Sequence, residues 1–332
     1  MANCACGGLK IRVSVVQFRP WPPDFAGRVA NPHVSPNSAA MRLGIPFLGR
    51  RNRRARIPIL VYHSLHAPGT DYASNDHVAL EEDLRLIKKL RFRVAPLAAI
   101  ARFAWGQGAA DLDDGQWVGL TFDDGTDYDY LDINLPDIGY IKSFYTILKE
   151  SGNAAALDWP QPTGVSFVIA SPDARRVLDR TCIAGRDNWR DTWWEEAAGT
   201  GILAIGNHSW DHTHPTLELV AQRNQLKGTF LGIDNLEDAD TQIRKAEEYI
   251  QHRTRGRSAG LFAYPYGEAS EYLVREYFPR FKERHRQFAA FTTAGEYALA
   301  EGGGWSIPRF MCGEHWKTPE ELEKILLGAK SR

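Results

Sequence analysis

The sequence predicts an α/β fold built on a parallel sheet whose strands are joined by crossover helices. Short apolar runs typical of buried strands alternate with longer stretches in which apolar residues recur at helical spacing. The chain has 332 residues and is 43% hydrophobic, which is enough to bury one large α/β core. No internal repeat is evident. The alternation allows either an open sheet or a sheet that closes into a barrel.

Each expected strand is a short apolar run, and several of these runs end in a polar residue or a glycine. The expected strands are 57–63, 116–125, 164–170, 201–207, 260–267, 288–293 and 305–310. The expected helices are 77–92, 138–152, 173–180, 191–199, 235–253, 270–278 and 318–329. The last helix has a favourable start, because Thr318 can cap it and Pro319 occupies its first position.

Residues 1–56 differ from the rest of the chain in charge and in pattern. They hold ten Lys and Arg residues against one acid, Asp24, so the remainder carries a net charge of −10 within a total of −1. They are rich in Pro, Gly, Asn and Ser and lack clear periodicity before Met41. We expect a basic, disordered N-terminal arm followed by one folded domain over 57–332. The alternative is that the run RRNRRAR contacts anionic lipid or nucleic acid.

Nothing in the sequence indicates membrane insertion, secretion or a disulfide framework. No apolar run approaches the roughly 18–20 residues of a membrane span. No apolar core precedes a small-residue cleavage site, so a cytoplasmic location is the default expectation. The cysteines are too few and too scattered to form a disulfide scaffold. They are Cys4, Cys6, Cys182 and Cys312.

The stretch TFDDG at 121–125 places two adjacent carboxylates, Asp123 and Asp124, at the end of an expected strand. Two such groups at a buried strand end repel each other unless a cation or a proton lies between them. The similar stretch LDDG at 112–115 follows no strand and is read as ordinary turn chemistry. Asp123 and Asp124 are therefore candidates for a metal site or an acid/base site.

The stretch GNHSWDHTHP at 206–215 contains three histidines. His208 and His212 are four residues apart, so one helical turn or a tight loop would aim both rings the same way. With one carboxylate they would form the open three-ligand set of a catalytic zinc site. His214 is expected to fix the loop, and the alternative is that all three are surface histidines. Functional residues of α/β folds gather where strands end. Five candidates lie at such positions: His63, Asp123, Asp124, His208 and Tyr266.

The motifs LTFDDG, GNHSWDHTHPTL and FAYPYG, in this order, resemble those of the polysaccharide deacetylases of the NodB-homology type, which are metal-dependent carbohydrate esterases. The opening ILVYHSL is similar to the branch that includes poly-N-acetylglucosamine deacetylases. The resemblance covers about residues 57–330. It implies a distorted (β/α) barrel with fewer than eight regular units, a divalent metal ion such as zinc, and an N-acetylated carbohydrate substrate.

By position, the resemblance makes Asp124, His208 and His212 the metal ligands and Asp123 the general base. The residue chemistry agrees with these roles, because amide hydrolysis needs an activated water and a group that accepts its proton.

The resemblance also implies that the backbone N–H of Tyr266 completes an oxyanion hole and that His63 is the general acid. The sequence departs from the family at Ala263, where many relatives carry an arginine that pairs with the base. Arg309 in SIPRF is expected to supply this charge from a later strand. The stretch between Gly125 and Gly164 is longer than usual for the family, and aromatic residues there and in the run at 188–194 could stack on sugar rings or instead pack in the core or form a lid. Those in the first stretch are Tyr128, Tyr130 and Trp159.

The expected function is removal of N-acetyl groups from an amino-sugar poly- or oligosaccharide. Two alternatives remain: a carbohydrate-binding pseudoenzyme of the same fold, suggested by Ala263, and a metal-dependent phosphoesterase. The phosphoesterase is disfavoured because no basic clamp for phosphate is evident. No nucleic-acid partner is expected. The sequence indicates neither the sugar nor the oligomeric state.

Overall fold

The structure is a computed structural model that describes residues 55–330 except 68, 109–111, 113–115, 136–138, 153–158 and 222. The expected basic arm over 1–56 therefore lies outside the described residues, apart from Ala55 and Arg56. Arg56 is part of the fold, because it begins β1 (Arg56–Ile57), which pairs antiparallel with β11 (Ala298–Leu299).

The main sheet is parallel throughout and runs in the order β10-β9-β8-β7-β4-β2-β12, with β3 beside β4. Its strands are β2 (Ile59–His63), β3 (Arg93–Val94), β4 (Trp117–Asp124), β7 (Gly164–Val168), β8 (Leu203–Asn207), β9 (Ser258–Ala263), β10 (Ala289–Phe291) and β12 (Phe310–Met311). The two edges of the sheet meet through one irregular segment. Ile307 bridges to Phe291 of β10, and β12 just beyond it pairs with β2. The predicted distorted (β/α) barrel is thus confirmed.

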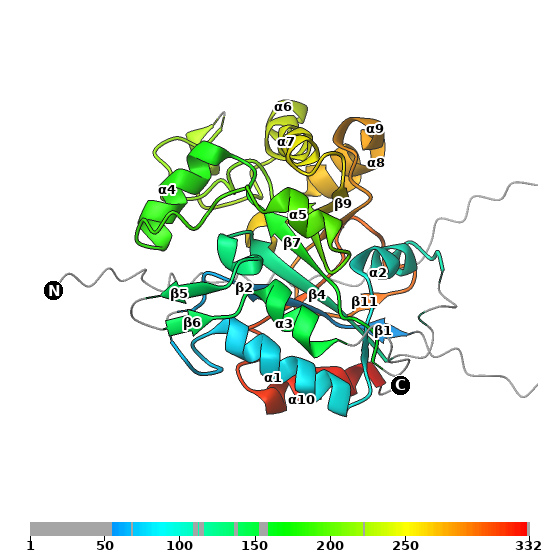
Figure 1. Cartoon of the computed structure of the whole chain (residues 1–332). Helices are drawn as coiled ribbons and strands as arrows, with labels where there is room; N and C mark the ends of the chain where they lie inside the picture. The colour runs from blue at the N-terminus through cyan, green and yellow to red at the C-terminus, as the bar shows by residue number, and fades with distance from the viewer. Residues whose placement is uncertain are drawn as a thin grey trace, which may run out of the picture. The chain divides into compact units, whose positions relative to one another are not determined.

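Helices cover the outer face of this barrel. They are α1 (Asp76–Lys89), α2 (Leu97–Ala104), α3 (Phe144–Ser151), α4 (Pro172–Cys182), α5 (Trp194–Gly199), α6 (Leu236–Ala239), α7 (Lys245–Arg253), α8 (Phe278–Arg280), α9 (Lys282–His285) and α10 (Pro319–Lys330). In Figure 1, α1 and α10 lie side by side along one side of the sheet, and α6 to α9 gather on the opposite side. None of the helices that the structure describes combines the length and the apolar character needed to cross a bilayer.

Alternation along β4 decides which of its side chains face the barrel interior. Leu120 and Phe122 are buried in the cluster that packs the sheet against the α1, α3 and α10 helices. Because successive side chains of a strand point to opposite faces, Thr121 and Asp123 point inward. Both contact the buried Arg309 there. The apolar period of the sequence thus aims Asp123 into the barrel.

Several expected elements differ in extent from those in the structure, and two of them differ most. The helix expected over 138–152 begins only at Phe144, where Ser143 caps it by accepting the Thr146 N–H. Its first part instead forms β6 (Gly139–Ile141), which pairs with β5 (Ile133–Leu135), because Ile141 packs with Ala67 and Tyr128 in a small separate cluster. The strand expected over 305–310 was also predicted too long, because only its end belongs to a regular strand, β12.

Candidate metal and catalytic site

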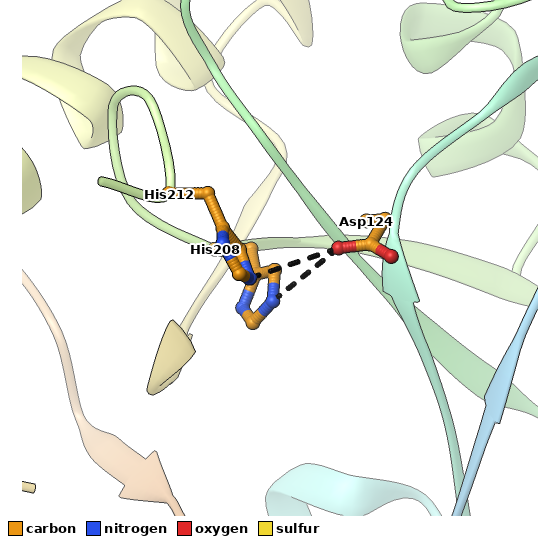
Figure 2. A group of neighbouring side chains, drawn as sticks. All are labelled: Asp124, His208 and His212. Carbon is orange, nitrogen blue, oxygen red and sulfur yellow. Dashed lines mark ion pairs between the residues drawn. The ribbon is translucent and has the colours of Figure 1, made fainter. Parts of the chain in front are cut away.

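The register of the parallel strands brings the candidate ligands together. Asp124, the last residue of β4, pairs with Val168 of β7, and Val168 pairs with Asn207, the last residue of β8. His208 follows Asn207 directly and His212 lies in the loop beyond it. The two imidazoles and the carboxylate face one another across the end of β7 (Figure 2).

Asp124, His208 and His212 form the group of potential metal-ligating side chains that the described residues contain. One ligand atom from each lies within 4.8 Å of the other two. The Nε2 atoms of His208 and His212 lie 3.7 and 3.9 Å from Oδ1 of Asp124. Ligands about 2.0–2.1 Å from a tetrahedral zinc ion lie roughly 3.4 Å apart, so the donor set has the right chemistry and nearly the right spacing.

The surroundings of the two rings leave their Nε2 atoms available. His208 Nδ1 lies 2.9 Å from the Ala263 carbonyl, which can only accept, so the proton belongs on Nδ1 and the Nε2 lone pair is free. His212 Nδ1 is buried without a hydrogen-bond partner. Burial lowers the pKa of His208, and it lowers the pKa of His212 well below its usual value. Both rings are therefore held neutral, which is the state that binds a metal ion.

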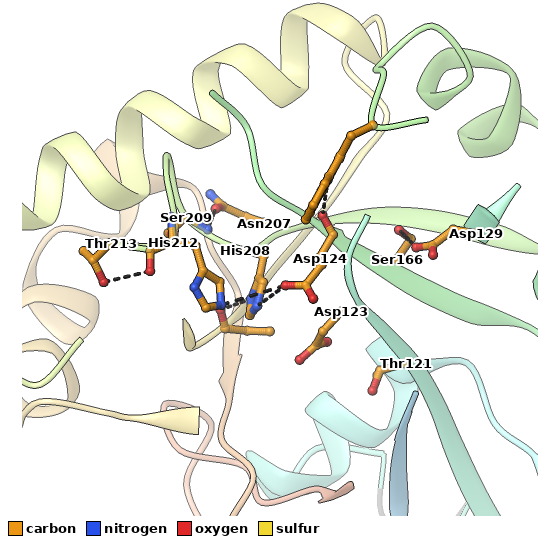
Figure 3. A network of polar contacts seen from close by, with 12 residues as sticks. Thr121, Asp123, Asp124, Asp129, Ser166, Asn207, His208, Ser209, His212 and Thr213 are labelled. Atoms are coloured by element: carbon orange, nitrogen blue, oxygen red, sulfur yellow. Dashed lines mark hydrogen bonds and ion pairs between the residues drawn. The ribbon is translucent and has the colours of Figure 1, made fainter. Parts of the chain in front are cut away.

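Left-handed backbone is concentrated at this site. Ordinary side chains occupy this region rarely, at a cost of roughly 1–3 kcal/mol for each residue, and such residues cluster at functional sites. The site contains five of them: Asp124 (φ 79°), Ser209 (φ 70°), His212 (φ 60°), Thr213 (φ 45°) and Tyr266 (φ 59°). The loop after β8 is kept in this form by its own polar groups, because Ser209 Oγ accepts the His212 N–H. Figure 3 shows this loop beside the carboxylates of β4.

Asp123 points into the barrel beside the ligand group and forms a buried ion pair with Arg309. Nη1 and Nη2 of Arg309 donate to Oδ1 and Oδ2 of Asp123, each at 2.8 Å. Burial by itself raises the pKa of the Asp123 carboxyl, but the charge and the hydrogen bonds of Arg309 hold that pKa below its usual value. Asp123 is therefore a carboxylate at neutral pH. Arg309 lies in the segment that closes the barrel. The positive charge beside Asp123 therefore comes from this segment and not from position 263, which is an alanine in this chain.

His63 and Tyr266 lie on either side of these groups. His63 ends β2 and pairs in register with Asp123. Its backbone N–H donates to Oδ2 of the buried Asp76 at 2.8 Å, which fixes the end of the strand. Tyr266 occupies a tight turn after β9, and its ring packs edge-on against His212 with centroids 4.5 Å apart. All the residues expected at the site thus lie at the same end of the barrel.

Other expected residues have different surroundings. His214 lies outside the ligand group, and its Nδ1 lies 2.9 Å from the Thr216 hydroxyl in the same loop. The aromatic residues considered for sugar stacking are buried, so core packing accounts for them in this structure. They are Tyr128, Tyr130, Trp159, Trp189, Trp193 and Trp194.

Sequence reasoning missed one group that contacts the site. The indole Nε1 of Trp189 donates to the backbone carbonyl of Asp124 at 3.1 Å. Trp189 lies in an irregular loop between α4 and α5, and no spacing or motif relates it to β4. Only the way the loop packs brings the two residues together.

Comparison with known proteins finds one family model that matches part of the chain. Residues 168–277 match the family model described as polysaccharide deacetylase. This range includes His208, His212 and Tyr266, while His63, Asp123, Asp124 and Arg309 lie outside it. No curated protein matches the chain.

Two solved structures share the fold. A polysaccharide deacetylase from Bacillus cereus has a TM-score of 0.52 and 15% sequence identity, over 82% of this chain and 69% of that one. A de-N-acetylase from Aggregatibacter actinomycetemcomitans has a TM-score of 0.51 and 15% identity, over 78% of this chain and 96% of that one. Residues 168–277 of this chain are therefore similar to the polysaccharide deacetylase family, and the chain shares its barrel fold with these two solved structures.

Proposed function

We propose that this protein is a metal-dependent hydrolase that removes N-acetyl groups from an amino-sugar poly- or oligosaccharide. The observation that carries the proposal is the placement of Asp124, His208 and His212 next to the buried pair of Asp123 and Arg309. A metal-binding group and a charged carboxylate side by side are what hydrolysis of an unactivated amide requires.

The proposed metal site consists of Nε2 of His208, Nε2 of His212 and Oδ1 of Asp124. Two neutral imidazoles and one carboxylate fit zinc, which favours nitrogen ligands and keeps an open position in catalytic sites. The hydrogen bond from His208 Nδ1 to the Ala263 carbonyl is consistent with this assignment, because it leaves the Nε2 lone pair of His208 free. A divalent ion held there would polarise the acetyl carbonyl and make water more acidic.

Asp123 is proposed as the general base. Its carboxylate oxygens each accept one hydrogen bond from Arg309 and retain a lone pair that can take a proton from water. The arginine keeps this carboxylate charged despite its burial. Asp123 is therefore prepared to accept a proton at the edge of the metal site.

His63 is proposed as the general acid that gives a proton to the departing amine, and the Tyr266 backbone N–H as the donor to the oxyanion. His63 stands beside Asp123 at the end of the neighbouring strand, so the two groups could serve the two faces of one substrate amide. Tyr266 has a left-handed backbone, and its ring packs against His212 at the edge of the proposed metal site. Fixed donors of this kind stabilise developing charge without reorganisation.

The experiment is to measure acetate release from a panel of N-acetylated oligosaccharides, with the chain as purified, after treatment with a chelator, and after zinc is added back. The proposal predicts release that the chelator abolishes and zinc restores. The alternative of a binding pseudoenzyme predicts oligosaccharide binding without release. The buried Arg309–Asp123 pair argues against that alternative, since it supplies the charge that Ala263 lacks.

A further inference from the structure

The loop of residues 187–193, here called the tryptophan loop, contacts the backbone of a proposed metal ligand. Nε1 of the buried Trp189 donates to the Asp124 carbonyl at 3.1 Å. The Ile169 N–H donates to the same carbonyl at 3.3 Å. The carbonyl of Asp124 is thus held by one donor from β7's end and one from a loop distant in sequence.

This carbonyl belongs to a strained turn. Asp124 and Gly125 have φ angles of 79° and 73°, so two consecutive residues are left-handed where β4 ends. Glycine suits the second position, because a Cβ there would lie 2.5 to 2.8 Å from atoms of Val168. Asp124 cannot be a glycine in the same way, because its carboxylate is a proposed metal ligand. Its left-handed conformation therefore costs roughly 1–2 kcal/mol. Hydrogen bonds that fix the Asp124 carbonyl offset this cost.

The backbone that carries this indole is anchored to α4 by hydrogen bonds. The Trp189 carbonyl accepts Nη1 of Arg175 at 3.2 Å. The carboxylate of Asp179 accepts the backbone N–H groups of Asp187 and Asn188 at 3.1 and 2.9 Å. The donor to Asp124 is therefore positioned before any ligand arrives.

A second attachment joins the tryptophan loop to the same turn, three residues beyond Asp124. The Asp127 N–H donates to the Asn188 carbonyl at 2.8 Å. The fully buried Asp127 carboxylate accepts the backbone N–H and Nε of Arg190 at 2.8 and 2.6 Å, and Nε1 of Trp193 at 3.1 Å. The turn and the loop therefore form one unit.

We infer that Trp189 is a positioning residue whose indole N–H fixes the left-handed backbone of Asp124 and thereby sets the affinity of the proposed site for a divalent cation. The inference rests on the proposed metal site. Groups that orient a metal ligand without touching the ion typically change metal affinity by about 10–100-fold. We expect a loss in this range when the indole donor is removed.

Two substitutions separate the hydrogen bond from packing. Trp189→Phe keeps an aromatic ring but lacks the N–H. Trp189→His has a smaller ring, but its Nε2 is separated from Cβ by the same number of bonds as Nε1 of tryptophan, so it can still donate. The matched control is Trp105→Phe, since Nε1 of Trp105 also donates to a backbone carbonyl, that of Phe288 at 3.0 Å. None of the contacts described for Trp105 involves the three proposed ligands.

The measurement is the affinity of the full chain for Zn²⁺ and Co²⁺, by competition with a chelator, together with the visible spectrum of the cobalt form. Trp189→Phe should weaken binding by about 10–100-fold and change the spectrum. Trp189→His and Trp105→Phe should bind like the parent. Circular dichroism verifies folding. If Trp189→Phe does not fold, Trp189→His decides, since parent-like affinity supports the inference and a loss overturns it.

Two results would overturn the inference by itself: equal affinities and spectra for the parent and Trp189→Phe, or a loss in Trp189→His as large as that in Trp189→Phe. The second result would mean that packing, and not the hydrogen bond, matters. A parent chain that binds neither ion overturns the proposed function and this inference together.

Discussion

Arg309 and Asp123 form a bidentate ion pair in the interior of the barrel, with both N–O distances at 2.8 Å. The guanidinium has no exposed surface and Asp123 is 3% exposed. Because both side chains are buried, each charge is stabilised mainly by the other. Arg309 also donates to the Thr121 hydroxyl and the Thr292 carbonyl. Breaking such a pair by removing one partner costs far more than replacing both.

Arg309→Met should therefore destabilise the protein by about 3–5 kcal/mol, because it leaves the Asp123 carboxylate buried and unpaired. The double variant Asp123→Leu, Arg309→Met should recover most of this loss, since it leaves no isolated charge. Urea unfolding of the parent, both single variants and the double variant gives the coupling free energy. A double variant that is no more stable than Arg309→Met would show that the two charges do not stabilise each other.

The neighbouring carboxylates should separate metal binding from proton transfer. Asp123→Asn should keep the metal while turnover falls by roughly 10²–10⁴, the usual effect of a positioned acid or base. Asp124→Asn should weaken metal binding first, and excess metal should restore part of the activity. Metal content and acetate release are measured for both variants. Loss of metal from Asp123→Asn and not from Asp124→Asn would reverse the proposed roles.

His63→Ala should leave the metal bound and slow amide hydrolysis far more than hydrolysis of activated aryl acetates. An aryl oxide departs without help, whereas an amine must be protonated as it leaves. The measurement is the ratio of amide to aryl-ester rates in the variant and in the parent. If both substrates slow equally, His63 is not the general acid. His315, whose Nδ1 accepts the Met311 N–H at 2.9 Å, is then the next candidate.

His77 should make stability depend on pH. It is buried against the Phe144 ring with centroids 4.1 Å apart, and burial lowers its pKa to about 4. An unfolded histidine titrates near 6.5, so the unfolded chain takes up the proton first as the pH falls. The stability contributed by neutral His77 is complete above that value and is lost as the pH falls towards 4. His77→Leu should therefore reduce the loss of unfolding free energy between pH 7 and pH 5 by about 1–2 kcal/mol.

Urea unfolding at both pH values tests this prediction. His285 remains in both proteins, and burial lowers its pKa to about 4 as well, so the variant should keep part of the pH dependence. An identical pH dependence for parent and variant would show that His77 does not titrate on unfolding.

The sequence was sufficient to predict the parallel sheet and the convergence of strand ends. Apolar alternation is a local property, and in a parallel sheet it brings residues such as His63, Asp123 and His208 to one edge. The register of β4, β7 and β8 then follows from keeping their apolar faces buried. The three proposed ligands were assigned from the resemblance of their motifs to a known family, and the strand register brings them together.

Contacts made by irregular segments could not be predicted in the same way. The hairpin of β5 and β6 replaced part of an expected helix because Ile141 packs into a local cluster that no periodicity indicates. The bond from Trp189 to Asp124 depends on how a loop without regular structure is anchored by α4. Loop positions are set by many tertiary contacts, so such pairs become visible only in the folded chain.

Hydrolysis is proposed to depend on a metal ion held by Asp124, His208 and His212. This dependence is tested most directly by measuring zinc content and acetate release together in the parent, the His208→Ala, His212→Ala double variant, and the control His214→Ala. His214 is a neighbouring histidine outside the ligand group. The parent and the control should each hold about one ion per chain and show chelator-sensitive activity, and the double variant should show neither. Undiminished zinc content in the double variant would contradict this assignment.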